Sequence, residues 1–162
     1  SQFFNRTTER LYLALVWGSL EEDEGTITGH VGRSLKNRLQ MDVFPDGEFG
    51  KHAVTHFKVL ERFSYVTLVE CKLETGRTHQ IRVHFSDAHY PIVGDATYGS
   101  KRMEKKELFP RLMLHAIELG LKHPVTQQAM VWKAPLPDDF QGVINQLGLK
   151  YDVDSIPLKS FK

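Results

Sequence analysis

Apolar and polar residues alternate along several segments of this chain, and a period of two is typical of β-strands. In residues 65–73, every second residue from Tyr65 to Leu73 is expected on one face. Residues 10–17 are apolar on both faces, which indicates a central strand of a sheet. Further strands are predicted at residues 53–63, which pair antiparallel with 65–73, and at 112–121 and 129–132.

Only two segments show helical spacing. After Gly76 breaks the 65–73 strand, another strand is possible, but we prefer a helix capped by Thr78, with Ile81, Phe85 and Ala88 on its buried face. A terminal helix is predicted from about Asp139 to Leu147. Since strands outnumber helices and mostly pair in sequence order, the predicted fold class is α+β, with a largely antiparallel mixed sheet.

Composition narrows the class of protein without identifying it. A chain of 162 residues, 41% hydrophobic and 25% charged, fits one globular domain with its own core. The net charge of +1 means that any nucleic-acid surface must be a local patch. The single cysteine, Cys71, forms no internal disulfide, fits a reducing compartment and is expected in the core. No membrane-spanning apolar run or signal peptide is seen, so we expect a cytoplasmic protein.

The most unusual stretch is residues 76–84, in which Arg77, His79, Gln80, Arg82 and His84 crowd together. A helix beginning here would present N–H donors beside the arginines, and together these groups would form an anion-binding site. Apolar sequence flanks the stretch, so one arginine should be partly buried and must find an anionic partner. The stretch holds no acidic residue, so we expect a substrate phosphate or a carboxylate from elsewhere.

Histidine spacing does not favour a metal site. His52 and His56 are four residues apart, but in a predicted strand that spacing separates them. His79, His84 and His89 recur every five residues, which fits no single helical face. We therefore predict no metal.

Residues 76–84, with the sequence Gly-Arg-Thr-His-Gln-Ile-Arg-Val-His, resemble the third motif of the RluA family of RNA pseudouridine synthases. Further segments of the family are matched in the same order, at residues 51–57, at residues 89–99, at the Leu-His-Ala of 114–116 and at the His-Pro of 123–124. Residues 10–18 resemble its tyrosine motif. The resemblance runs from about Thr8 to Phe140, and it implies a catalytic domain over residues 1–150 with a tail at 151–162.

The resemblance also implies chemistry. Pseudouridine synthesis cuts the C1′–N1 bond of a uridine, turns the base and rejoins it through C5, with no cofactor or metal. Tyr12 matches the family's active-site tyrosine, and Arg82 matches the arginine that pairs with its catalytic aspartate. Leu114 and Ile81 would line the substrate pocket. The residues expected to contact RNA, mainly through phosphates, are Arg33, Lys36, Arg38, Lys51, Arg77, His79 and Gln80.

One motif of the family is missing. The nucleophilic aspartate lies in a His-Arg-Leu-Asp sequence before the tyrosine motif, and residues 1–11 contain no aspartate. Arg82 would then lack its carboxylate. The chain therefore looks like a piece of a catalytic domain, incomplete at its N-terminus and inactive alone, whose partner would be ribosomal or transfer RNA. The alternative is a natural short relative that binds RNA without modifying it.

Overall fold

The computed structural model describes residues 9–63, 65–99, 111–122, 129–133 and 137–146. Its main sheet has six strands in the order β2-β5-β6-β1-β7-β8, and every pairing between neighbours is antiparallel. The strands are β1 (Glu9–Trp17), β2 (Glu24–Thr28), β5 (Val54–Arg62), β6 (Val66–Leu73), β7 (Leu114–Lys122) and β8 (Ala129–Lys133). A small two-stranded sheet joins β3 (His30–Arg33) to β4 (Met41–Phe44).

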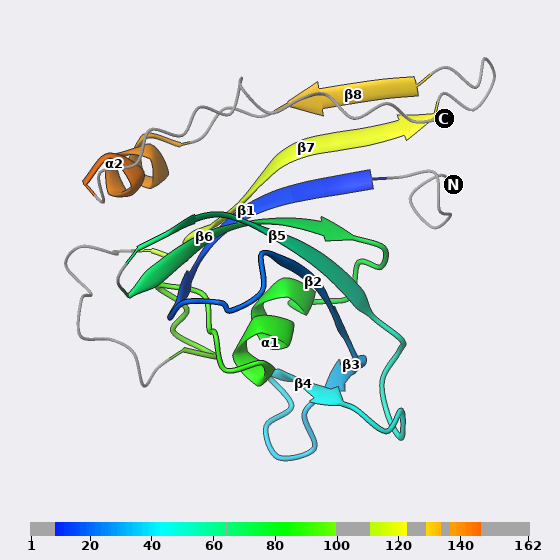
Figure 1. The fold of residues 1–162 in the computed structure, drawn as a ribbon. Coiled ribbons are helices and arrows are strands. Elements are labelled where there is room, and N and C mark those ends of the chain that lie inside the picture. Colours follow the sequence, from blue (N-terminus) through cyan, green and yellow to red (C-terminus); the bar gives the residue numbers. More distant parts are fainter. Residues whose placement is uncertain (1–8, 64, 100–110, 123–128, 134–136, 147–162) are drawn as a thin grey trace.

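The two helices cover opposite faces of the main sheet (Figure 1). Helix α1 (Gln80–Asp87) lies under β2, β5 and β6, with the β3–β4 hairpin beside it, and α2 (Asp138–Gln146) lies on the other side. Strand β1 contributes side chains to the hydrophobic clusters on both faces of the sheet, because successive side chains point to opposite faces. Leu13 and Leu15 join the cluster that includes Phe140 of α2, whereas Ala14 and Val16 join the cluster that includes Phe85 of α1.

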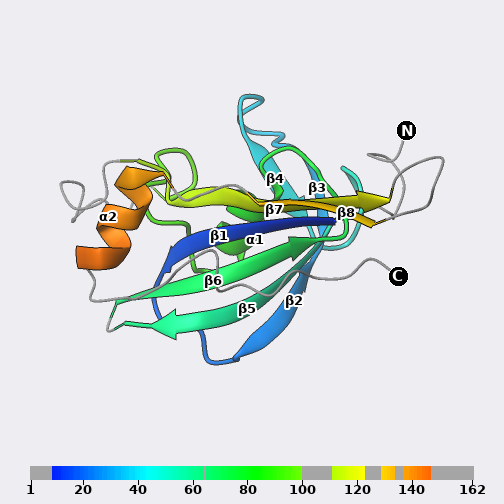
Figure 2. The ribbon, with the colours of Figure 1, turned by 90° about the horizontal axis from the view of Figure 1, so that it is seen from above.

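Seen from above in Figure 2, the long strands fan across the molecule, and β1 lies between β6 and β7. The predicted central position of this strand is therefore confirmed. The 53–63 and 65–73 pair and the strands at 112–121 and 129–132 are also found, with ends shifted by a few residues. The α+β class with a largely antiparallel sheet is confirmed.

Three short strands are found that the sequence analysis did not predict. Strand β2 begins at Glu24 and Gly25 and pairs with β5. Strands β3 and β4 flank an exposed loop that carries Lys36 and Arg38. These strands are short and rich in glycine or charge, so they carry little alternation of their own.

The β3–β4 hairpin is held by a close approach between two backbones. The amide and carbonyl of Val31 exchange hydrogen bonds with those of Lys51, at 2.9 and 3.0 Å. A Cβ on Gly50 would lie 2.6 Å from the carbonyl of Val31, and one on Gly32 would lie 2.7 Å from the Cα of Gly50. Only glycine allows this contact, so these two positions anchor the hairpin.

Several segments of the sequence analysis lie outside the described residues: residues 1–8, the His-Pro at 123–124, Leu147 and the tail at 151–162. The predicted division into residues 1–150 and 151–162 stays a prediction.

Candidate active site

The segment before α1 is organised by the side chain of Gln80, which is 2% exposed. Its Oε1 accepts hydrogen bonds from the Thr75 hydroxyl at 2.7 Å and the Arg77 amide at 3.0 Å. Its Nε2 donates to the carbonyl of Val54 and to the Thr55 hydroxyl. Gln80 therefore fastens the turn at 74–77 to β5. The prediction that Gln80 contacts RNA was wrong, because its side chain is buried and makes all of its hydrogen bonds within the protein.

The predicted helix exists, but its start was placed wrongly. The residue before the helix is His79, not Thr78, and it adopts the left-handed conformation with φ 55° and makes no side-chain capping bond. Ile81 and Phe85 are buried as expected, at 4% and 1% exposure. Ala88 is half-buried and ends the helix instead of extending its apolar face.

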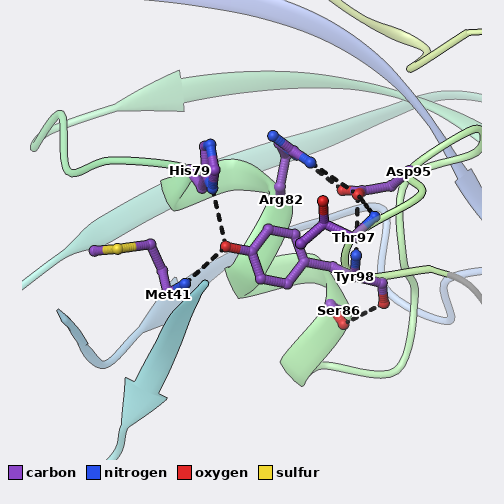
Figure 3. Close-up of polar contacts among 7 residues, drawn as sticks. All are labelled: Met41, His79, Arg82, Ser86, Asp95, Thr97 and Tyr98. Atoms are coloured by element: carbon purple, nitrogen blue, oxygen red, sulfur yellow. Dashed lines mark hydrogen bonds and ion pairs between the residues drawn. The ribbon is translucent and has the colours of Figure 1, made fainter. Parts of the chain in front are cut away.

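Arg82 pairs with a carboxylate from elsewhere in the chain, which was one of the two partners expected for a partly buried arginine. The expectation that Arg82 would lack a carboxylate within this chain was wrong. Its Nε and Nη2 donate to the two oxygens of Asp95, each at 2.9 Å, and its side chain is 19% exposed (Figure 3). The missed residue was the aspartate of the Gly-Asp turn, thirteen positions away. The paired geometry raises the pKa of Arg82 further above its usual value, mainly through the hydrogen bond to Asp95.

Asp95 itself is fully occupied. Its Oδ1 also accepts the backbone N–H groups of Thr97 and Tyr98, both at 3.0 Å, and its side chain has no exposed surface. Burial acts to raise the pKa of Asp95, but the hydrogen bonds from Arg82, Tyr98 and Thr97 outweigh it and hold the pKa below its usual value. A carboxylate with this many donors and no access cannot attack a substrate.

The predicted catalytic residue Tyr12 and the two predicted pocket residues, Ile81 and Leu114, share one apolar cluster on the sheet side of α1. Tyr12, on β1, and Leu114, on β7, are partly buried and pack against the same apolar cluster that contains Ile81 of α1. Strand β1 shifts register against β7 between Leu11 and Tyr12. Such a bulge re-aims the following side chain, and here that side chain is the one predicted to act on the base.

The predicted RNA contacts gather on and around the hairpin. Arg33, Lys36, Arg38 and Lys51 are exposed, and Arg77 donates from Nε to the carbonyl of His52 at 2.9 Å. The hairpin loop also exposes Leu35 and Leu39, at 60% and 85%. A hollow of about 380 Å³ lies between this loop and α1, on the side of the helix away from Tyr12, with Asp42, Ser86 and Tyr98 among its lining residues.

Two titratable residues of the core are not arranged for chemistry. His84 is buried, its Nδ1 lies 2.8 Å from the Thr55 hydroxyl, and burial lowers its pKa. Burial likewise raises the pKa of the Cys71 thiol, which stays protonated as the core residue that was predicted. Among the residues that the structure describes, no three His, Cys, Asp or Glu side chains group as metal ligands, and no helix is long and apolar enough to cross a membrane.

Comparison with solved structures identifies the class of fold. Human RNA pseudouridylate synthase domain containing 1 superposes with a TM-score of 0.67 at 31% identity, over 91% of this chain and 68% of that one. Human RNA pseudouridylate synthase domain containing 4 gives a TM-score of 0.70 at 23% identity, over 91% of this chain and 65% of that one, which shows the fold alone. The domain is thus a pseudouridine synthase fold.

A family model described as RNA pseudouridylate synthase matches residues 1–87, and the chain belongs to this family, in its RluA-type branch. An uncharacterised RNA pseudouridine synthase of Bacillus subtilis is 47% identical over 91% of this chain and 46% of its own length. Ribosomal large subunit pseudouridine synthase D of Nitrosomonas europaea is 42% identical, over 90% of this chain and 43% of its own. The chain therefore spans about half the length of the curated relatives it matches.

Proposed function

We propose that these residues form the part of an RNA pseudouridine synthase that holds the base and orients the nucleophile. The observation that carries the proposal is that Tyr12, Ile81 and Leu114 share one apolar cluster, and that Ile81 is followed on the helix by the partly buried Arg82. The substrate would be a uridine in ribosomal or transfer RNA, extruded from its stack. Two of the named relatives act, by their names, on the large ribosomal subunit.

In this proposal each residue has one task. Ile81 and Leu114 form the apolar wall that receives the uracil ring, and the aromatic ring of Tyr12 stacks on the detached base. The hydroxyl of Tyr12 assists removal of the C5 proton. Arg82, held by Asp95, presents its guanidinium to the catalytic aspartate and keeps that carboxylate ionised.

The aspartate would come from a segment outside these 162 residues, so the chain alone would be inactive. Two facts support this. The family's aspartate motif is absent from the sequence before Tyr12, and the chain spans only about half of its relatives. An unpaired Arg82 would have been a third argument for an aspartate outside the chain, but Arg82 is paired with Asp95. Arg82 would thus serve two carboxylates, one structural and one catalytic.

The test is conversion of uridine to pseudouridine by the complete reading frame and by these 162 residues, measured by mass spectrometry of digested ribosomal and transfer RNA. We expect activity in the complete protein and none in the shorter chain. Tyr12→Phe should lower kcat by a factor of roughly 100 or more, the range for removal of a general base.

The matched control is Tyr90→Phe, which removes a hydroxyl from another tyrosine packed on the same cluster. It should keep full activity. A complete protein that binds RNA but converts no uridine would overturn the enzymatic proposal and favour the RNA-binding alternative.

A further inference from the structure

Tyr98 touches three separate parts of the molecule at once (Figure 3). Its ring lies 5.2 Å from the guanidinium carbon of Arg82, and its carbonyl accepts a hydrogen bond from the Ser86 hydroxyl at 3.0 Å, so it is fixed to α1. Its amide donates to Asp95, so it is also fixed to the turn that pairs with Arg82. These contacts explain a partly buried aromatic residue but not its hydroxyl.

The hydroxyl reaches the third part, the hairpin. The backbone amide of Met41, the first residue of β4, donates to the Tyr98 oxygen at 2.9 Å, and Nδ1 of His79 lies 2.9 Å from the same atom. The hydroxyl oxygen is therefore shared between the start of the helix and the edge of the hairpin. In the described residues, this oxygen is the polar atom that joins the hairpin to the support of Arg82.

The protonation state of His79 fits this arrangement. Burial lowers its pKa, and the charges of Arg82 and Arg33 lower it further, against an opposing effect of Asp95. A neutral His79 can accept the Tyr98 proton at Nδ1, which leaves the lone pairs of the phenol free to accept the Met41 amide. The three groups are then mutually satisfied, with one donor for each acceptor.

We infer that Tyr98 is a positioning residue that couples the β3–β4 hairpin to the orientation of Arg82. The inference rests on the proposed function, in which the hairpin contacts RNA and Arg82 orients the nucleophile. An RNA that fixes the hairpin also fixes the Met41 amide, and with it the phenol of Tyr98 that accepts its hydrogen bond. The Tyr98 ring and the Asp95 turn, which both contact the guanidinium of Arg82, are then fixed as well. Coupling of this kind is reciprocal, so a fixed Arg82 also favours the bound hairpin.

The decisive variant is Tyr98→Phe, which removes one oxygen and keeps the ring, the amide to Asp95 and the carbonyl to Ser86. In the 162-residue chain, proton exchange at the Met41 amide and at Nε–H of Arg82 can be followed by NMR. Both should exchange about ten times faster in the variant, since an exchange rate follows the free energy of local opening. Faster exchange at Met41 with no change at Arg82 would overturn the inference.

Ser86→Ala is the matched control, because it removes a hydroxyl that bonds Tyr98 but leaves the link to the hairpin intact. It should change exchange at Met41 and Arg82 by less than about twofold. Equal effects of the two variants would show that Tyr98 acts by packing alone and would overturn the coupling.

An RNA titration separates this inference from the proposed function. A uridine-containing stem-loop added to the wild-type chain should slow exchange at Arg82, and the same RNA bound to Tyr98→Phe should not. RNA binding that leaves the rate of proton exchange at Arg82 of the wild-type chain unchanged would overturn the coupling. Should Tyr98→Phe not fold, this wild-type measurement decides alone.

Failure of the RNA to bind would instead contradict the RNA surface, while the exchange of Met41 and Arg82 still decides whether the phenol couples them. In the complete enzyme, Tyr98→Phe should lower kcat by about tenfold because the orientation of Arg82 is lost, and reciprocal coupling should raise KM by no more than about the same factor. A rise in KM with kcat unchanged would overturn the inference.

Discussion

Gly94 lies directly against the backbone of Arg111, so that a Cβ on Gly94 would overlap the carbonyl oxygen of Arg111. Gly94 also has φ +80°, a left-handed conformation that favours glycine. The next residue is Asp95, whose carboxylate holds Arg82. The approach of two backbones thus sets where the support of the proposed catalytic arginine lies.

We expect Gly94→Ala to lower the free energy of unfolding by on the order of 3 kcal/mol, since it adds both backbone strain and a steric overlap. Gly142→Ala is the control, because Gly142 lies in α2 with no atom within 4 Å of the added carbon. It should raise the free energy of unfolding by about 0.5–1 kcal/mol, the helix preference of alanine. Urea denaturation checks both, and a Gly94→Ala chain as stable as the wild type would contradict the contact.

Gln80 gives a second prediction, because sequence reasoning and structure assign it different roles. Gln80→Leu would leave the Arg77 amide and the Thr75 hydroxyl without the acceptor that they share in a partly buried place. It would also remove one of the two donors to the Val54 carbonyl, which keeps its hydrogen bond from the Glu74 amide. The free energy of unfolding should fall by about 3 kcal/mol, the cost of unpaired buried groups. Gln141→Leu, on α2 with one exposed bond to Asn145, should change it by less than about 0.5 kcal/mol.

A loss of RNA affinity in Gln80→Leu without a loss of stability would restore Gln80 to the RNA surface. Thermal unfolding and RNA titration of the same preparation distinguish the two roles.

Asp95 predicts how stability depends on acid. Its folded pKa lies below its unfolded value, although burial alone would raise it, because Arg82 and two backbone amides favour the ionised form. The stabilisation is therefore complete above the unfolded pKa, near 4, and is lost as pH falls through the lower folded pKa. Unfolding curves from pH 5 to 2 should show a steeper loss for the wild type than for Asp95→Asn.

The variant should be less stable than the wild type at pH 7, and the two should converge as the pH approaches 2. Parallel curves over that range would mean that Asp95 does not titrate with folding.

The sequence predicted the strands that carry regular alternation and missed those held by tertiary contacts. Residues 65–73 bury both faces, so their apolar pattern is strong. Strand β3 forms because Gly32 and Gly50 let two backbones meet, and no periodic pattern records that contact. The site followed the same rule. Tyr12 and Arg82 were proposed from ordered motifs, whereas the sequence analysis named no carboxylate for Arg82, although a turn can deliver one to a helix, as Asp95 does.

The last prediction concerns where RNA binds. Lys36→Ala with Arg38→Ala removes two exposed cations from the hairpin loop, and Lys58→Ala with Arg62→Ala removes the same two residue types from β5, where Arg62 pairs with Asp23. Each phosphate contact adds roughly 0.7–0.9 to the slope of log K against log salt. We expect the hairpin variant to lose about 1.5 from that slope and the β5 variant to keep it, as measured by fluorescence titration of a labelled stem-loop between low and moderate salt.

Equal losses in the two variants would mean that the RNA responds to overall charge and not to the hairpin. A loss confined to the hairpin variant, with unfolding curves unchanged in both, would make this loop the phosphate-contacting surface beside Arg82.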